Sequence, residues 1–124
     1  MSTIQKVMSL AVLVGALSLV AAVSAFGGAS STDATTVAVT AGKPSELRFT
    51  LSKKTVAKGA TTFKVTNKGA VSHDFKIAGK KTPMLKSGKA ASFTVTFKKA
   101  GKFAYLCTVP GHAVAGMKGT LTVK

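Results

Sequence analysis

The sequence of 124 residues contains one cysteine, two histidines and only three acidic residues. One cysteine cannot form a disulfide within the chain, although exported domains of this size often depend on such bonds. The acidic residues Asp33, Glu46 and Asp74 offer no reaction-ready pair of carboxylates for general acid–base catalysis. No nucleophile is spaced with a base to activate it. We therefore expect the chain not to be an enzyme on its own.

Acidic charge is as scarce as basic charge is abundant. The chain has 18 lysines and arginines, nearly all of them lysine and spread along its whole length. It lacks a basic helix and a basic patch interleaved with aromatic residues, so we expect no nucleic-acid partner. One interpretation of the charge is a solvated lysine surface. The other is a field that steers the protein toward an acidic redox partner or an anionic membrane or wall surface.

The N-terminal segment is typical of an export signal. Lys6 precedes the apolar stretch 10–23, and small residues at 23–25 offer a cleavage site, so residues 1–25 are predicted to be a signal peptide. The alternative is an uncleaved anchor helix, because residues 7–26 are just long enough to span a bilayer. No cysteine lies near the cleavage site to carry a lipid, and no twin arginine precedes the apolar stretch. We expect an exported protein, periplasmic or on the outer face of the cytoplasmic membrane. Cleavage would leave 17 basic against three acidic residues, a net charge of +14.

The remainder of the chain is expected to form one all-β domain, residues 36–124, after a flexible lead of small and polar residues at 26–35. Apolar residues alternate with polar ones in short segments separated by Gly, Lys and Asn, which is typical of antiparallel strands with one buried face. No segment has convincing helical periodicity, and about seven short strands favour a sandwich or barrel. The longest expected loop is 79–89. The predicted strands are 36–40, 46–51, 62–67, 73–78, 92–97, 102–107 and 119–123.

The single cysteine opens a short run that also contains a histidine and a methionine: Cys107, His112 and Met117. Thiolate and thioether are soft ligands and imidazole suits copper. Two imidazoles, one thiolate and a weak axial methionine make a blue-copper electron-transfer site. His73 is the only other histidine in the chain and would supply the second imidazole. The sequence therefore predicts one copper ion bound by His73, Cys107, His112 and Met117.

Strand parity supports this ligand set. Side chains at i, i+2 and i+4 of a strand share one face. Three of the four candidate ligands have the parity of apolar residues, so each is expected to point inward at a strand end, while His112 closes over the site from a loop. The pairs are His73 with Phe75 and Ile77, Cys107 with Phe103 and Tyr105, and Met117 with Leu121 and Val123.

Each residue also has an ordinary interpretation when it is taken singly. Cys107 could be a small buried hydrophobe, His73 a histidine bonded to the backbone, His112 part of a turn and Met117 a core residue. Their convergence on one place favours metal binding. Zinc could accept two histidines and a cysteine with water as the fourth ligand, but methionine is a poor zinc ligand and a common axial copper ligand, so copper is favoured.

Two blocks of sequence resemble a known family, the cupredoxins, which are the small blue copper proteins of the plastocyanin and azurin group. The resemblance runs from about Val37 to the C-terminus. Four residues separate Cys107 from His112 and four separate His112 from Met117, which is more similar to auracyanin and rusticyanin loops than to the shorter plastocyanin loop. The blocks are Phe63-Lys-Val-Thr-Asn67-Lys-Gly69 with His73-Asp74-Phe75, and Gly101-Lys-Phe103-Ala-Tyr105-Leu-Cys107-Thr-Val-Pro110-Gly111-His112 with Gly116-Met117-Lys-Gly119-Thr-Leu121-Thr-Val123.

The resemblance implies a Greek-key β-sandwich and a mononuclear type 1 copper, with His73, Cys107 and His112 as equatorial ligands and Met117 as the axial one. It also implies that His112 lies at the surface and passes electrons through its ring edge. Asp74 would then support the ligand loop by accepting hydrogen bonds near Thr108; otherwise it is a plain surface carboxylate. The apolar residues that surround His112 are Val109, Pro110, Ala113, Val114 and Ala115, which ordinary loop packing would also explain.

The expected function is reversible one-electron carriage by a monomer, between redox proteins that are acidic at their docking face. A second hypothesis is copper binding and delivery without shuttling. It is disfavoured because the mature chain has only Met84 and Met117 and no cluster of histidines. A third is a copper enzyme, which would need further histidine-bound copper centres. A fourth is a wall-binding β domain without a redox role, and the complete ligand set argues against it.

Overall fold

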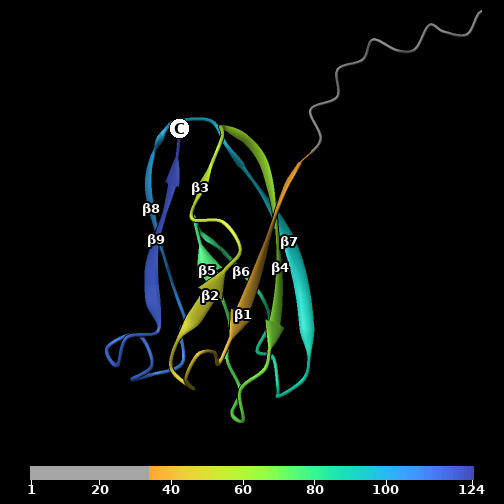
Figure 1. The fold of residues 1–124 in the computed structure, drawn as a ribbon, viewed down its shortest axis with the longest axis vertical. Helices are drawn as coiled ribbons and strands as arrows, with labels where there is room; N and C mark the ends of the chain where they lie inside the picture. The colour runs from red at the N-terminus through yellow and green to blue at the C-terminus, as the bar shows by residue number, and fades with distance from the viewer. Residues whose placement is uncertain (1–33) are drawn as a thin grey trace, which may run out of the picture. The chain divides into compact units, whose positions relative to one another are not determined.

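The computed structural model describes residues 34–124, which form two β-sheets (Figure 1). The predicted signal peptide or anchor helix, and all but the last two residues of the predicted lead, lie outside the described residues. Within 34–124 no helix has the length and apolar character needed to cross a membrane. The strands are β1 (Thr35–Ala41), β2 (Phe49–Leu51), β3 (Thr55–Val56), β4 (Gly59–Asn67), β5 (Lys76–Ile77), β6 (Lys80–Lys81), β7 (Ala90–Phe97), β8 (Gly101–Leu106) and β9 (Lys118–Val123).

The strands assemble into a four-stranded sheet in the order β2-β1-β4-β7 and a five-stranded sheet in the order β3-β9-β8-β5-β6. Two pairs are parallel, β1 with β4 and β3 with β9, and the other neighbours are antiparallel. The chain crosses repeatedly from one sheet to the other, and the two sheets share one hydrophobic core. The predicted all-β Greek-key sandwich is confirmed.

Side-chain burial alternates along the central strands as the apolar pattern predicts. Along β4 every second residue is buried from Thr61 to Asn67, and along β1 Val37, Val39 and Ala41 are buried. Successive residues of a strand point to opposite faces, so these positions line the inner face of the sheet. The register pairs Val37 with Phe63, which places the apolar residues of neighbouring strands side by side.

Phe75, in the segment that carries His73, contacts both sheets. It is fully buried and lies two residues after His73. Its ring packs edge-to-face on Phe49 of one sheet at a centroid distance of 5.2 Å and against Tyr105 of the other at 5.4 Å. Aromatic pairs at these separations add stability beyond the area that they bury. The segment that carries His73 is therefore anchored in the core.

Two predicted strands are shorter than expected. Of the predicted strand 46–51 only β2 pairs with a neighbouring strand. The N–H of Gly42 donates to the carbonyl of Arg48 at 2.9 Å, and this bond closes the residues between them into a loop. Of 73–78 only β5 pairs regularly, and His73 instead forms an isolated bridge with Leu85. The two-residue strands β3 and β6 were not predicted. The loops after β1, β4 and β8 lie at one end of the sandwich, the lower end in Figure 1.

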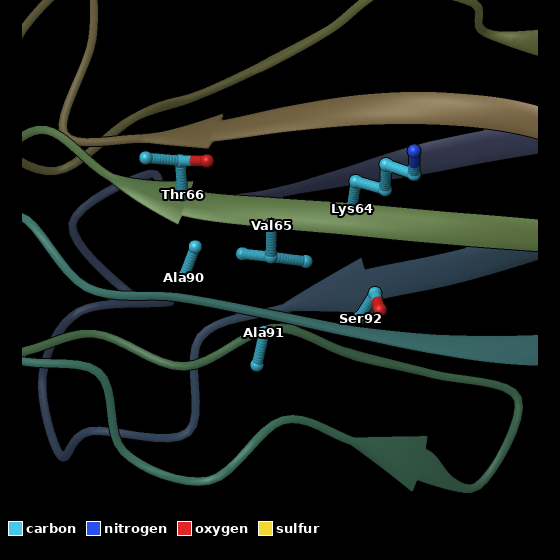
Figure 2. A pocket seen from close by; sticks show the side chains of 6 residues that line it. All are labelled: Lys64, Val65, Thr66, Ala90, Ala91 and Ser92. Atoms are coloured by element: carbon cyan, nitrogen blue, oxygen red, sulfur yellow. The ribbon is translucent and has the colours of Figure 1, made fainter.

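A shallow hollow of about 370 Å³ lies on the four-stranded sheet, where β7 presents small side chains opposite β4 (Figure 2). It has no histidine, cysteine or methionine in its lining, so it is separate from the predicted ligands. The residues that line it are Lys64, Val65, Thr66, Ala90, Ala91 and Ser92.

Candidate metal centre

Two loops at the same end of the sandwich carry the four predicted ligands. His73 lies in the connection from β4 to β5, while Cys107 follows β8 directly and Met117 precedes β9. These three side chains are at most 1% exposed, and His112, within the loop, is half-buried. The inward orientation expected from strand parity for His73, Cys107 and Met117 is confirmed.

The ring nitrogens and the thiol converge on one point. The Nδ1 atoms of His73 and His112 are 3.2 Å apart, and the Sγ atom of Cys107 lies 3.9 Å from the first and 3.6 Å from the second. The two rings are tilted by 57° with centroids 5.0 Å apart. Two loops separated by more than thirty residues thus present three donor atoms to a common centre.

This spacing fits a single small metal ion. Nitrogens about 2.0–2.1 Å and a sulfur about 2.3 Å from one tetrahedral ion lie roughly 3.3–3.6 Å from one another, close to the observed separations. Met117 is buried in the same apolar cluster as Cys107 and Ala41. Thiolate, thioether and two imidazoles form the soft and borderline donor set that suits copper.

The loop between β8 and β9 holds its own shape through backbone hydrogen bonds. The N–H of Cys107 donates to the carbonyl of Met117 at 3.1 Å, and the N–H of Met117 donates to the carbonyl of His112 at 3.0 Å. The N–H of His112 donates to the carbonyl of Val109 at 3.0 Å. Gly111 takes a φ of +88°, in the left-handed region that favours glycine, within this turn. The spacing of the three residues is therefore fixed by the backbone itself.

Asp74 ties the two loops together. Its side chain is buried, its Oδ1 accepts a hydrogen bond from the N–H of Thr108 at 2.6 Å, and its Oδ2 accepts one from the Thr108 hydroxyl. The predicted hydrogen bonds near Thr108 are confirmed. Asp74 adjoins His73 and Thr108 adjoins Cys107, so this contact holds the two ligand-bearing segments at a constant separation.

Glu46 also contacts the site, a role that its sequence context did not predict. Its carboxylate accepts hydrogen bonds from the N–H of Ala70 at 2.8 and 3.0 Å and from the N–H of Val71 at 3.1 Å, and its Oε1 lies 2.8 Å from Nε2 of His73. The backbone donors, with a smaller contribution from His73, lower the pKa of Glu46 to about 2. The only signal in the sequence was rarity, since an acidic residue is unusual in this lysine-rich chain.

Arg48 and Asn67 are further contacts that sequence reasoning missed. The Arg48 guanidinium donates to the carbonyl of Ala115 at 3.3 Å, and a β-carbon on Gly116 would collide with it. The buried amide of Asn67 donates to the carbonyls of Val71 and Leu85 at 2.8 and 2.7 Å and accepts from the N–H of Gly69 at 2.8 Å. Arg48 therefore supports the loop that contains His112, and Asn67 supports the loop before His73.

Burial sets the chemistry of the thiol. Desolvation is the largest influence on Cys107 and raises the pKa of its thiol. Metal ions bind the thiolate, so binding at this centre releases the thiol proton.

The large exposed hydrophobic side chains of the described residues lie close in sequence to the candidate ligands or to the bridge partner of His73. Val114, which is 89% exposed, lies two residues after His112, and Val71 lies two residues before His73. Met84 precedes Leu85, the bridge partner of His73. The loop of the half-buried His112 therefore exposes an apolar side chain, that of Val114.

Comparison with known proteins finds similarity to copper-binding proteins. The family profile described as copper binding proteins, plastocyanin/azurin family, matches residues 35–124. Auracyanin-B of Chloroflexus aurantiacus is 52% identical over 42 residues, which are 34% of this chain and 18% of that protein. The copper-resistant cuproprotein CopI of Pseudomonas aeruginosa is 46% identical over 41 residues, 33% of this chain and 23% of that one. The matches thus span less than a quarter of each of these relatives.

Solved structures extend the similarity over most of the chain. A structure of auracyanin B superposes with a TM-score of 0.66 at 27% identity, covering 77% of this chain and 93% of the other. Rusticyanin from Thiobacillus ferrooxidans superposes with a TM-score of 0.59 at 27% identity, covering 76% and 79%.

Proposed function

The chain belongs to the plastocyanin/azurin family of copper-binding proteins, and from this premise we propose that it carries single electrons between redox partners. The ion would be one type 1 copper held by His73, Cys107 and His112, with Met117 as the axial ligand. The observation that supports this most is the convergence of two Nδ1 atoms and one Sγ atom within 3.2–3.9 Å of one another. Bound copper supplies a one-electron couple between Cu(II) and Cu(I).

The residues around the site keep the donors in one arrangement for both oxidation states. Backbone hydrogen bonds fix the loop from Cys107 to Met117, and Asp74 fixes that loop to the segment of His73. Burial of His73, Cys107 and Met117 keeps water from the donor atoms. A site that changes little between the two states reorganises little when it gains or loses an electron.

His112 is proposed as the route for the electron. It is the only one of the four residues with an appreciably exposed side chain. The exposed Val114 and Pro110 beside it give a partner an apolar surface from which water is easily displaced. A partner docked here would approach the ring edge of His112 directly.

The charge of the domain supports partners that are acidic at their docking face, or an anionic membrane or wall surface. Residues 34–124 contain 17 lysines and arginines, and their two acidic residues, Glu46 and Asp74, are both engaged in hydrogen bonds at the site. A field of one sign raises the association rate with partners of the opposite sign. We propose that the protein acts as a monomer.

The domain organisation and location remain part of the proposal. Residues 1–25 would direct export as a signal peptide or uncleaved anchor, 26–35 would form a lead, and 36–124 would form the copper domain in the periplasm or on the outer face of the cytoplasmic membrane. Support comes from the charged start, apolar stretch and small residues of the N-terminal sequence.

We propose no enzymatic turnover by this chain. Both of its histidines lie at the one centre, which leaves none for a second histidine-bound copper. Glu46 and Asp74 each accept several hydrogen bonds and are not paired with each other.

The similarity to CopI favours a second candidate, in which the protein binds and hands over copper without shuttling electrons. The two candidates differ in how firmly copper is held. An electron carrier retains its ion through repeated reduction and oxidation, whereas a delivery protein releases it to a strong Cu(I) chelator within a few cycles. Measuring released copper per redox cycle distinguishes them.

The ligand assignment is tested by loading the protein with Cu(II) and recording its visible and electron-spin-resonance spectra. We expect an intense thiolate-to-copper band that bleaches on reduction and returns on oxidation. Cys107→Ser should abolish the band. Met84→Leu is the matched control, because Met84 is the other methionine in 34–124 and is exposed, and it should keep the band. Retention of the band in Cys107→Ser would overturn the assignment.

A further inference from the structure

His73 has two ring nitrogens, and both have defined surroundings. Nδ1 faces Sγ of Cys107 and Nδ1 of His112, at 3.9 and 3.2 Å. Nε2 lies 2.8 Å from Oε1 of Glu46. A neutral imidazole has one N–H and one lone pair, and a carboxylate can only accept a hydrogen bond. The proton therefore belongs on Nε2, which leaves the lone pair of Nδ1 directed at the centre.

The Glu46 carboxylate is held in place by backbone groups. Both of its oxygens accept from the N–H of Ala70, and Oε1 also accepts from the N–H of Val71. Gly69 leaves the space that the carboxylate fills, because a β-carbon there would collide with Oε1. The acceptor facing His73 therefore cannot swing away without breaking backbone hydrogen bonds.

The connection from β1 to β2, which contains Glu46, also contacts the loop that contains His112. Arg48, two residues after Glu46, donates to the carbonyl of Ala115 in the loop that contains His112. The connection from β1 to β2 therefore contacts both halves of the centre, although it contributes no ligand itself.

We propose that Glu46 is the positioning residue for His73: its carboxylate accepts the Nε2–H, so that Nδ1 is the nitrogen presented to the metal, and its charge favours Cu(II) over Cu(I). Carboxylate partners of metal-bound histidines fix the ring tautomer and raise ligand basicity. This inference rests on the proposed copper site and extends it to a residue outside the ligand set.

The first test separates charge from hydrogen bonding. In Glu46→Gln the amide oxygen can take the place of Oε1 and keep its contacts to Ala70, Val71 and His73, while the negative charge and the second acceptor for Ala70, Oε2, are lost. We expect the preference for Cu(II) over Cu(I) to fall about tenfold, which is a rise of about 59 mV in the one-electron potential. Lys68→Gln is the matched control, because it removes an exposed charge of the opposite sign from the loop between β4 and β5 that holds the Glu46 carboxylate, and it should lower the potential slightly.

The second test uses the copper-free protein, so it does not depend on copper binding. Long-range ¹H–¹⁵N spectra should show His73 of the wild type and of Glu46→Gln with its proton on Nε2. In Glu46→Ala the acceptor is gone, and the spectra should show a mixture of both tautomers with faster exchange of the ring N–H. A folded Glu46→Ala whose His73 signals match the wild type would overturn the proposal. So would a Glu46→Gln potential that moves no further than, or in the same direction as, that of Lys68→Gln.

Failure of the proposed function gives a different pattern. If the wild type forms no thiolate-to-copper band, the electron-carrier proposal fails, while the tautomer of His73 in the copper-free protein still decides whether Glu46 positions the ring.

Discussion

Both carboxylates of residues 34–124 are engaged at the same end of the sandwich, each in a different task. Asp74 accepts two hydrogen bonds from Thr108 and fixes one loop to the other, while Glu46 accepts from the loop before His73 and faces the ring of His73 itself. The single cysteine and both histidines lie there too. Rarity of a residue type was therefore informative: the chain uses few such residues and places them together.

Replacing Asp74 tests whether its contact holds the two loops together. Asp74→Ala leaves the N–H of Thr108 without its acceptor, at an expected cost of about 1–3 kcal/mol in the free energy of unfolding, and should speed copper release to a chelator. Asp74→Asn keeps one acceptor oxygen and should lose less. Denaturant unfolding of the copper-free protein and chelator kinetics of the loaded protein measure the two effects. Wild-type values for Asp74→Ala in both would contradict a supporting role.

At the scale of elements, the long alternating segments were predictable from sequence and the short ones were not. The period-two pattern identified β1, β4, β7, β8 and β9 to within three residues at each end. The two-residue strands β3 and β6 are too short to show any alternation. They exist because neighbouring strands offer backbone partners, a property of the assembled sheet that a local pattern does not contain.

Contacts made by the loops are even harder to predict from a local sequence pattern. Residues 46–51 alternate like a strand, but Glu46 and Arg48 point their side chains at the two ligand loops and only β2 pairs. These contacts join residues 27 and 67 positions apart. The candidate ligands stand out in the sequence because their chemistry is specific, whereas glutamate, arginine and asparagine occur on any surface and are identified only by what they touch.

Asn67 provides a test at the level of a loop. Its buried amide is the partner of Val71, Leu85 and Gly69, and Asn67→Ala leaves the Val71 carbonyl and the Gly69 N–H without theirs. Two such groups at about 1–3 kcal/mol each predict a loss of roughly 2–6 kcal/mol in the free energy of unfolding. Thr66→Ala, a half-buried neighbour that makes none of these contacts, is the control. Equal denaturant midpoints for the two variants would show that the loop does not depend on Asn67.

For the whole molecule, the dominant property is charge of one sign. Lysines lie on both sheets and on the loops at both ends, for example Lys64, Lys102, Lys43 and Lys99, and all four are exposed. The carboxylates that could offset them are held at the metal centre. The field is therefore positive around the whole domain, and it attracts anions without selecting a face. The apolar surface beside His112 would select the docking orientation instead.

Attraction of partners by charge, and their orientation by the apolar surface, together predict how electron exchange depends on salt. An anionic redox reagent such as ferrocyanide should react at least about tenfold more slowly in 1 M salt than in 0.01 M salt, because steering of this kind raises association rates by about 10–10³ and the Debye length falls from about 30 Å to about 3 Å. A cationic reagent of matched potential should show the opposite trend, and a neutral one almost none. Equal salt trends for anionic and cationic reagents would mean that the lysines do not steer.

Val114→Ser should slow exchange with a protein partner while leaving the salt dependence for small reagents unchanged, because it removes apolar contact and no charge. An unchanged rate with the protein partner in Val114→Ser would mean that docking occurs away from His112.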